Sequence, residues 1–440
     1  MPRSIAFCTL GCKVNQYETE AIRGRLLARG FVEVPWKAPA DVYVINTCTV
    51  TEGGDQASLK LVRRVRRQNP QATVVVAGCY VDALRKGVEG TPQVLGADLL
   101  VANHEKAALP ELLERHLGGE AVSGAPAWAG WRANGAIDHL TVSQFRDHTR
   151  ATLKVQDGCD LFCTFCIIPW VRGKPVSKPI DVVVREARTL AANGYREVVL
   201  TGIHLGAYGR DLGTGLVALV ERLGEVEGLE RIRLSSLEAD ELGEREIDAF
   251  TSHPRVCAHF HVPLQSGDDG VLERMNRRYA SGEFLAKVAR MRERVPRLSV
   301  TTDVIVGFPG ETDEAFGNTL RVCREAAFSK IHVFPYSDRT GTPAARMADK
   351  VEKRVLRSRC RALATLGREL GLAYRAPFVG EVVRPLVELR RDRATGLLVG
   401  LTERYLRVRF EGDDGLANTM PRVRVAGTGP WWVAGELVRA

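Results

Sequence analysis

The sequence predicts an α/β protein made of an N-terminal doubly wound parallel sheet, a central partial (β/α)6 barrel and a small C-terminal antiparallel β domain. Strand-like and amphipathic helical segments alternate along most of the 440 residues, as in parallel sheets covered by helices. After Tyr374, short strand-like runs with glycine-containing turns replace this alternation. A chain of this length exceeds one ordinary core, so we expect domains at residues 1–117, 145–374 and 375–440, with a linker at 118–144.

The N-terminal part contains four strand-like runs separated by helical patterns. In chain order we expect a strand at residues 4–10, a helix at 19–29, a strand at 41–46, a basic helix at 55–68 and strands at 73–77 and 99–101. The stretch that follows is rich in glycine and alanine and shows no period, which is typical of a linker.

Six further strand candidates predict the barrel. They begin near Thr152, Glu197, Arg231, His259, Ser299 and Lys330, with helical segments between them, for example at residues 181–193, 216–225 and 284–295. Six βα units are fewer than the eight that close a full barrel, so we expect an open one. A helix at 352–370 ends this domain, and strands at 382–389, 397–401, 405–410 and 422–425 form the last one.

The composition is that of a globular protein, with 45% hydrophobic and 26% charged residues. A formal net charge of +9 permits a polyanionic partner without requiring one. No apolar run approaches the roughly 20 residues of a membrane span, and the start of the chain is unlike a secretory signal. We therefore expect a cytoplasmic protein that has no membrane partner. In that compartment, ten cysteines favour metal ligation or catalysis over disulfides.

The strongest chemical signal is a C-x₃-C-x₂-C motif formed by Cys159, Cys163 and Cys166. Thiolates are the ligands of iron–sulfur clusters, which usually take four of them. Three close cysteines therefore leave one iron open to a substrate or cofactor. A structural zinc site is the alternative, but such a site needs four ligands and no cysteine or histidine pair completes this one.

A second set of thiols follows three predicted parallel strands. Cys12, Cys48 and Cys79 each lie just beyond the carboxyl end of a strand, where ligands bind in open α/β sheets. We expect these thiols to converge on one metal centre, although three reduced core cysteines are the alternative. The four other cysteines lack such placement and are predicted to serve packing: Cys8, Cys257, Cys323 and Cys360.

Together these motifs resemble the radical S-adenosylmethionine methylthiotransferase family over almost the whole chain. The resemblance includes TLGCKVNQYET at residues 9–19, NTCTV at 46–50, the Cys159 motif and TDVIVGFPGET at 302–312. It is closest to the branch that acts on N6-threonylcarbamoyladenosine in tRNA, through KVNQ at 13–16, TGIHLG at 201–206, FPYS at 334–337 and GTP at 341–343. The last domain resembles the RNA-binding TRAM domain in GLLVGLT at 396–402 and VRF at 408–410.

The resemblance implies two [4Fe-4S] clusters, each with three cysteine ligands. Cys12, Cys48 and Cys79 hold the auxiliary cluster that supplies or carries sulfur, and the Cys159 motif holds the cluster that binds S-adenosylmethionine. The implied reaction replaces the C2–H of the adenine at position 37, next to the anticodon, with C2–S–CH₃. Because no ordinary base removes that hydrogen, the chemistry rests on the cofactors rather than on a catalytic side chain.

Other residues at the carboxyl ends of barrel strands are candidates for binding S-adenosylmethionine. We expect backbone groups at the end of the second strand to face the methionine moiety. Polar side chains after the third strand are expected to reach the ribose, and the end of the fifth strand is expected to lie against adenine. In that order, the candidates are Thr201 and Gly202, then Ser235, Ser236 and Glu238, then the stretch at 304–307 with Val306 and Gly307. Ordinary loop polarity and core packing are the alternatives.

The C-terminal domain supplies candidates for contact with RNA, because charged and aromatic side chains mix there. These are Arg404, Tyr405, Arg407 and Arg409. One departure from the family concerns the stretch after the cluster motif, where Val176 and Lys178 stand at positions at which we expect arginine. Lysine keeps the charge but loses bidentate geometry, which puts substrate contacts there in doubt.

The expected partners are a tRNA substrate, an electron-donor protein and a sulfur-donor protein, and we expect a monomer. Rival readings within the family are action on isopentenyladenosine in tRNA or on a ribosomal protein side chain. A rival of another class is an iron–sulfur RNA-binding sensor without turnover, but that reading gives no reason for an open cluster beside a barrel.

Overall fold

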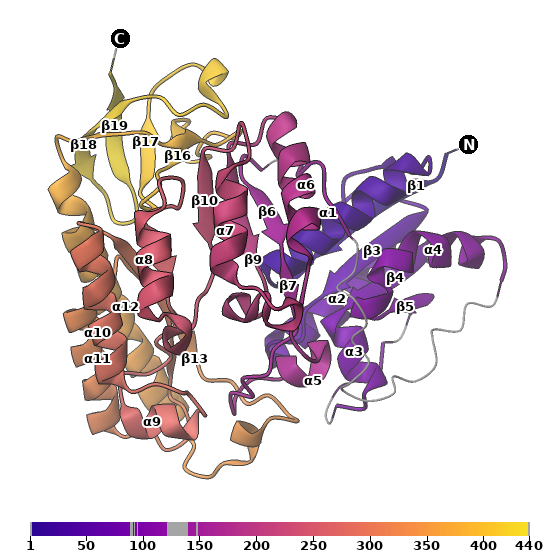
Figure 1. The fold of residues 1–440 in the computed structure, drawn as a ribbon. Coiled ribbons are helices and arrows are strands. Elements are labelled where there is room, and N and C mark those ends of the chain that lie inside the picture. The colour runs from indigo at the N-terminus through magenta and orange to yellow at the C-terminus, as the bar shows by residue number, and fades with distance from the viewer. Residues whose placement is uncertain are drawn as a thin grey trace.

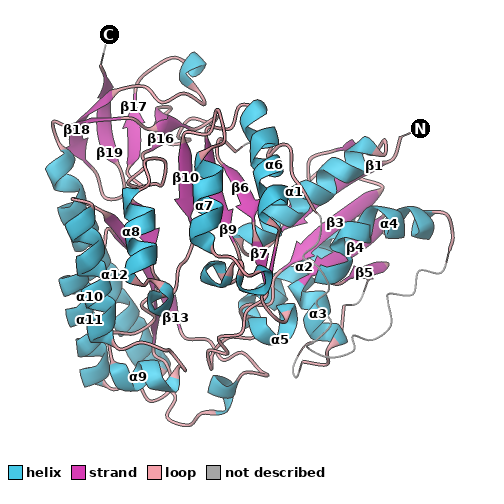
Figure 2. Ribbon diagram, in the orientation of Figure 1, coloured by secondary structure: helices cyan, strands magenta, loops and turns pink. Residues whose placement is uncertain are grey.

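The computed structural model describes residues 2–88, 91, 93–94, 96–120, 140–146 and 148–438. Figure 1 shows the N-terminal sheet beside the central barrel, with the C-terminal sheet set against one end of the barrel. Figure 2 shows helices covering one side of the barrel strands. Within the described ranges, no helix has both the length and the apolar character that a membrane crossing requires.

The N-terminal domain is a five-stranded parallel sheet in the order β2-β1-β3-β4-β5. Its strands are β1 (Ser4–Thr9), β2 (Val32–Glu33), β3 (Val42–Thr47), β4 (Thr73–Gly78) and β5 (Leu99–Val101). Alternate residues face opposite layers. Val42 and Val44 pack with α1 (Lys13–Ala28) and α4 (Leu109–Leu117), whereas Tyr43 and Ile45 pack with α2 (Glu52–Gln68) and α3 (Cys79–Arg85). The predicted doubly wound sheet is confirmed.

The central domain is an open barrel of six parallel strands in chain order. They are β6 (Ala151–Lys154), β9 (Glu197–Thr201), β10 (Arg231–Leu234), β11 (His259–His261), β12 (Ser299–Val306) and β13 (Lys330–Pro335). Single bridges, including one between Ser236 and His261, join β10 to β11. The six predicted strands are confirmed, as is the partial barrel.

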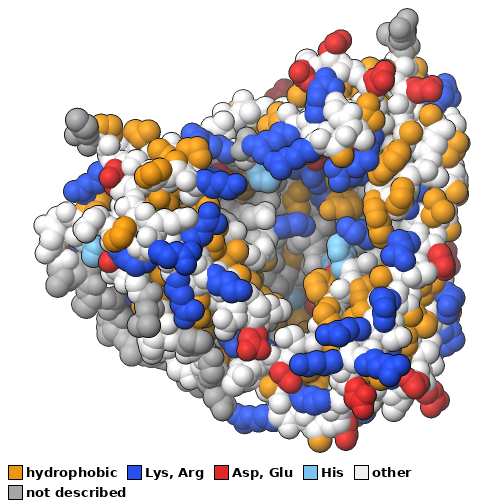
Figure 3. Space-filling model, turned by 180° about the vertical axis from the view of Figure 1, so that it is seen from behind, with side chains coloured by type: hydrophobic (Ala, Val, Ile, Leu, Met, Phe, Trp, Pro, Cys, Tyr) orange, Lys and Arg blue, Asp and Glu red, His pale blue; other side chains and the backbone are white. Residues whose placement is uncertain are grey.

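Helices cover the outer side of these strands. They are α6 (Ile180–Ala192), α7 (Leu216–Gly224), α8 (Glu244–Ser252), α10 (Ser281–Arg294), α11 (Asp313–Ala326) and α12 (Lys353–Arg375), and the shorter α5 (Ile168–Arg172) and α9 (Asp269–Arg274) lie in the loops. Val300, Val304 and Val306 of β12 belong to the core between strands and helices. The alternate residues Thr301 and Asp303 therefore face the inner side of the barrel, which we call the lumen. Seen from behind, the molecule is hollowed between the N-terminal domain and the barrel, with Lys and Arg side chains around the hollow (Figure 3).

The C-terminal domain is a curled six-stranded sheet in the order β14-β18-β19-β17-β16-β15. Its strands are β14 (Val382–Val383), β15 (Leu386–Val387), β16 (Leu398–Leu401), β17 (Arg407–Phe410), β18 (Val423–Thr428) and β19 (Val433–Leu437). Neighbours are antiparallel except β17 and β19. Because β14 and β15 follow each other in the chain yet lie at opposite edges, the sheet curls.

The β16–β17 loop of this domain seals the amino ends of the barrel strands. Arg231 and Arg233 of β10 donate hydrogen bonds to the carbonyls of Leu401, at 3.1 Å, and Thr402, at 3.0 Å. The ring of Tyr405 stacks on His259 of β11, with 4.3 Å between ring centroids. The C-terminal domain therefore covers part of the amino end of the lumen.

Most departures from the predicted elements are short segments. The short β2, the helix α3 and the last strand β19 were not expected, and α1 begins at Lys13 rather than at residue 19. The predicted linker at 118–144 lies mostly outside the described residues. At its described end, Leu140 and Val142 are buried in the barrel core.

Candidate functional site

The three N-terminal cysteines lie at the switch point of the sheet, where the strand order reverses between β1 and β3. Cys12 follows β1, Cys48 follows β3, and Cys79 is the first residue of α3. A methyl group on Gly11 would lie 2.7 Å from Cβ and 2.9 Å from Sγ of Cys48, so only glycine allows this close approach. Burial raises the pKa of Cys48 to about 11, and the nearby Cys79 and Cys12 raise it further. The three thiols therefore lie near one another at the carboxyl edge of the sheet.

Polar donors surround the innermost of these thiols. Arg172 Nε lies 3.2 Å and Asn103 Nδ2 lies 3.5 Å from Cys79 Sγ. Burial raises the pKa of the Cys79 thiol, and the charges of Arg172 and Lys106 oppose that rise. Donors and cations beside a sulfur favour its thiolate, the form in which cysteine binds iron. The residues present thus fit an iron–sulfur cluster.

The second set lies in the loop between β7 (Gln156–Asp157) and α5. Gly158, with φ of +74°, starts this loop, and a methyl group there would collide with the carbonyl of Lys174. Burial raises the pKa of Cys166 to about 12, and neighbouring Cys163 adds to the rise. Burial likewise raises the pKa of Cys159, with contributions from Cys166 and Cys163. The described cysteines form no disulfide, so these thiols are free to bind metal.

The surroundings of the second set also fit a cluster. Arg277 Nη1 donates to Cys163 Sγ at 3.2 Å and pairs with Glu238. An apolar shell that includes Leu161 and Ile168 packs against the cysteines. Such a shell limits water and sets the electronic properties of a bound cluster. Sequence reasoning missed Arg277, because it lies more than a hundred residues from the motif and in no recognisable pattern.

A buried ionic network joins the two cysteine sites. Arg172 follows the Cys166 motif and reaches across to α1, where it donates to Glu18 at 2.9 Å and to Asn15 at 2.8 Å. Glu18 also pairs with Lys106 and, at 2.8 Å, with Lys154. Burial alone would raise the pKa of Glu18, but the three cations hold it well below its usual range. Two helices extend this connection, because Ile167 before α5 packs with Cys79 of α3.

A second bridge connects the end of the barrel with the NTCTV motif. Arg339, in the loop after β13, donates to the Thr49 carbonyl at 3.1 Å and pairs with Asp55 at 3.0 Å. Both side chains of this ion pair are 3% exposed. Arg339 therefore fixes the segment beside Cys48 against the barrel. The sequence motif gave no signal for it, because both partners lie far away in the chain.

The predicted cofactor residues are only partly brought together. Thr201 ends β9, and a methyl group on Gly202 would lie 2.7 Å from Gln156 Oε1, so the backbone is tightly held beside the cluster loop. Ser235 and Ser236 follow β10, and Glu238 pairs with Arg277 beside Cys163.

The side chain of Val306 is completely buried in the core on the helical side of β12, so only its backbone is available for the predicted contact. Gly307 turns away as well, since its N–H donates to Glu311 Oε1 at 3.0 Å and it faces Leu356. Ile305 instead packs in the cluster that includes Phe165. Ile305 belongs to the stretch at 304–307 that the sequence analysis proposed, and strand alternation from Val300 puts it on the inner side.

The predicted RNA contacts are largely engaged within the protein. Tyr405 stacks on His259, and Arg404 pairs with Glu403 at 3.0 Å. Arg409 pairs with Asp392 at 2.8 Å and lies over the ring of Trp432. Arg407 remains half exposed. It lines a groove of about 740 Å³ between the C-terminal sheet and the barrel, with further basic side chains from Arg150, Lys330, Arg375, Arg390 and Arg391.

The departure at Lys178 has a structural explanation. Its Nζ donates to Tyr17 Oη at 2.8 Å, to the Leu140 carbonyl at 3.0 Å and to Glu186 at 2.8 Å. The side chain is 1% exposed, and its three donors are used. Lys178 therefore does not contact a substrate. Val176 lies on the short strand β8 (Val176–Ser177), paired with Asp157.

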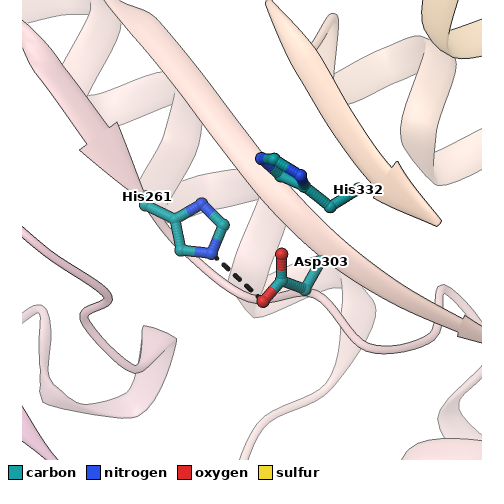
Figure 4. A group of neighbouring side chains, drawn as sticks. All are labelled: His261, Asp303 and His332. Carbon is teal, nitrogen blue, oxygen red and sulfur yellow. Dashed lines mark ion pairs between the residues drawn. The ribbon is translucent and has the colours of Figure 1, made fainter. Parts of the chain in front are cut away.

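Polar side chains also gather inside the lumen. His261 of β11, Asp303 of β12 and His332 of β13 point toward one another, as Figure 4 shows, and their ligand atoms lie within 4.8 Å of one another. His261 Nε2 lies 3.3 Å from Asp303 Oδ2, and His261 Nδ1 lies 2.9 Å from Thr301 Oγ1. No local sequence pattern indicates this cluster, because its three residues come from three separate strands.

Comparisons with known proteins match both halves of this site. The profile of the Radical SAM superfamily matches residues 153–323, and that of "Uncharacterized protein family UPF0004" matches residues 4–100. The fold resembles the radical S-adenosylmethionine methyltransferase TsrM from Kitasatospora setae, with a TM-score of 0.59 and 16% identity, over 78% of this chain and 77% of that one.

Two curated relatives are similar over nearly the full length. The threonylcarbamoyladenosine tRNA methylthiotransferase MtaB of Bacillus subtilis is 39% identical, over 99% of this chain and 96% of its own. The tRNA-2-methylthio-N(6)-dimethylallyladenosine synthase of Pelotomaculum thermopropionicum is 34% identical, over 95% of this chain and 94% of its own. The chain therefore belongs to the radical S-adenosylmethionine methylthiotransferases, an enzyme family whose relatives modify tRNA.

Proposed function

We propose that this enzyme methylthiolates C2 of N6-threonylcarbamoyladenosine at position 37 of tRNA. The observation that carries this proposal is the full-length similarity to relatives named for that substrate, in a chain that has both cysteine sites. The substrate also accounts for the cytoplasmic location expected from the sequence.

We assign one [4Fe-4S] cluster to each cysteine set. Cys12, Cys48 and Cys79 would hold the auxiliary cluster, and Cys159, Cys163 and Cys166 the cluster that binds S-adenosylmethionine. When bound, these cofactors supply the radical and sulfur chemistry that an unactivated aromatic C–H requires. The proposed division of labour follows the domains at 1–117, 145–374 and 375–440.

The side chains of this protein orient and shield the cofactors. Arg172 and Arg277 donate to Cys79 and Cys163 and stabilise the thiolates. The apolar shell around the second set excludes water. Glu18 compensates the buried charge of Arg172 and so keeps that donor in place between the two sites.

We place S-adenosylmethionine at the carboxyl ends of the barrel strands. Thr201, Gly202 and the backbone beside Gln156 are its candidate contacts near β9, and Ser235, Ser236 and Glu238 near β10. Ile305 replaces Val306 as the candidate for an apolar contact. An electron donor and a sulfur donor complete the partners that this chemistry needs.

Nucleoside analysis tests the substrate. In cells that lack this protein, tRNA is expected to lose the methylthio form and to accumulate threonylcarbamoyladenosine, and the gene with all six cysteines should restore it. Restoration should fail with Cys12→Ala and with Cys159→Ala. Loss of the methylthio form of dimethylallyladenosine instead would transfer the assignment to the substrate named for the second group of relatives.

Iron analysis tests the two clusters separately from the substrate. After anaerobic reconstitution, Cys159→Ala and Cys12→Ala are each expected to retain about half the iron of the unmodified protein, and the double variant almost none. Cys323→Ala is the matched control, because Cys323 is buried in the barrel core far from both motifs. Equal iron in the single variants and the unmodified protein would contradict the two-cluster assignment.

A further inference from the structure

The cluster of His261, Asp303 and His332 belongs to neither of the two cysteine sites. It lies on the inner side of three adjacent barrel strands, and its side chains are partly accessible to solvent. His261 bonds to Asp303 and Thr301, whereas His332 has no hydrogen bond among the described residues and meets His261 edge to face at 5.8 Å. The imidazole of His332 therefore offers one hydrogen-bond donor and one acceptor to a ligand in the lumen.

The charges around this cluster favour an anion. Lys13 directly follows Cys12 and is exposed to solvent. Its pKa is lowered by burial and by the charges of Arg150 and Arg233, against the charge of Asp303, so its ammonium lies within the electrostatic reach of these barrel residues. Burial lowers the pKa of His332, and the charges of Lys330, His261 and Lys13 lower it further, against Asp303. Arg233 already compensates Glu197, at 2.7 Å. Positive charge thus exceeds negative charge on this side of the lumen.

The same balance argues against a resident metal ion. Two histidines and a carboxylate are a familiar ligand set, but a divalent cation here would be repelled by the Lys13 charge, which acts on both Asp303 and His332. A ligand with a carboxylate and a hydroxyl matches better. The carboxylate would meet the cations, and the hydroxyl would donate to Asp303.

A threonylcarbamoyl group carries one carboxylate and one hydroxyl, whereas a dimethylallyl group carries neither. We propose that Lys13, His261, Asp303 and His332 form the subsite for the threonylcarbamoyl group. Lys13 and His332 hold its carboxylate, and the His261–Asp303 pair accepts its hydroxyl. This inference rests on the proposed function and makes these four residues the determinants that distinguish the two adenosine modifications.

Binding of modified RNA tests the subsite without relying on turnover. Anticodon stem-loops would carry either threonylcarbamoyladenosine or its neutral threoninamide counterpart, and their Kd values would be measured on reconstituted protein of verified iron content. The unmodified enzyme is expected to prefer the carboxylate by about 10- to 100-fold. Lys13→Met and His332→Phe should each remove most of this preference, and Lys13→Arg should retain most of it.

Lys353→Met is the matched control, because Lys353 is exposed at the start of α12 on the outer side of the barrel. It should keep the full preference. A preference that survives both Lys13→Met and His332→Phe would overturn the subsite. So would a stoichiometric metal other than iron that is lost on His261→Ala. If instead the unmodified enzyme binds and modifies only dimethylallyl stem-loops, the proposed substrate itself fails.

Discussion

At the scale of single residues, burial decides which polar groups are available for chemistry. Lys178 and Arg172 both follow the cluster motif, yet the side chains of both form hydrogen bonds within the protein. Lys178 joins α1, the segment near Leu140 and α6, whereas Arg172 joins the two cysteine sites. The departure from arginine at position 178 can therefore be explained by packing within the protein, without a change in substrate contacts.

Lys178→Met tests that structural role. The substitution leaves Glu186 buried without its cation, so the free energy of unfolding should fall by about 3 kcal/mol or more. Adding Glu186→Gln removes the uncompensated charge and should recover part of the loss. Thermal unfolding of the three proteins provides the measurement. A variant that is stable but defective in binding RNA would assign Lys178 to the substrate instead.

His259 makes stability depend on pH. Burial holds the pKa of this imidazole well below its usual range, and Arg233 adds to the effect. Below about pH 6.5 the unfolded chain binds a proton at this position that the folded chain does not, so stability falls as pH falls.

Between pH 7.5 and 5.5, His259 alone should lower the free energy of unfolding by about 1 kcal/mol. His259→Gln should remove that part of the pH dependence. Urea unfolding of both proteins at the two pH values measures it. Identical pH dependence in the variant would show that His259 is protonated in the folded protein.

At the scale of elements, two loops of unusual backbone geometry present the thiols. Gly11 follows β1 and Gly158 follows β7, and both adopt positive φ where a side chain would strike neighbouring atoms. Glycine at these two positions thus allows each loop to bring its cysteines closer to other chain segments than a residue with a side chain would permit.

Gly158→Ala should disturb the loop of the second cluster. The new methyl group collides with the Lys174 carbonyl, and an alanine is strained at φ of +74°. We expect reconstituted iron to fall toward half, with loss of S-adenosylmethionine cleavage. Gly282→Ala is the control, since nothing lies within 4 Å of a methyl group there. Full iron content in Gly158→Ala would mean that the loop relaxes without displacing its thiols.

Elements with a clear period could be predicted from the sequence, and contacts between distant elements could not. The six barrel strands are apolar runs between amphipathic helices, and all six appear where expected. The strand β19 was missed because Val433–Leu437 contains glycine and charge, although it lies in the middle of the curled sheet. Arg277, Arg339 and His332 were missed because their partners lie on other elements, which no local pattern reveals.

At the scale of the whole molecule, the C-terminal sheet is a structural part of the barrel. Leu401 at the end of β16 and Thr402 in the β16–β17 loop accept hydrogen bonds from Arg231 and Arg233, and Tyr405 of the loop covers His259. A TRAM-like module expected to reach toward RNA is therefore also the closure at the amino end of the barrel strands.

A chain that ends at residue 374 tests this dependence. Without the sheet, Arg231 and Arg233 lose buried acceptors and the lumen opens at its amino end. The truncated protein should unfold several degrees below the full chain, and Tyr405→Ala should fall between them. Thermal unfolding followed by circular dichroism measures all three. Equal midpoints would make the sheet an independent module.

The hollow described between the N-terminal domain and the barrel restricts the form in which RNA can react. Among the described residues, helices lie outside the barrel strands and the C-terminal sheet at one end, so the hollow is the route that we consider for a nucleobase to the inner face of β12. A base that reacts inside a recess has to leave the stack of its neighbours, so the nucleotide must first swing out of its strand. Extrusion costs least in an unpaired loop. The shape of the protein thus selects a loop nucleotide before any atom of its modification is recognised.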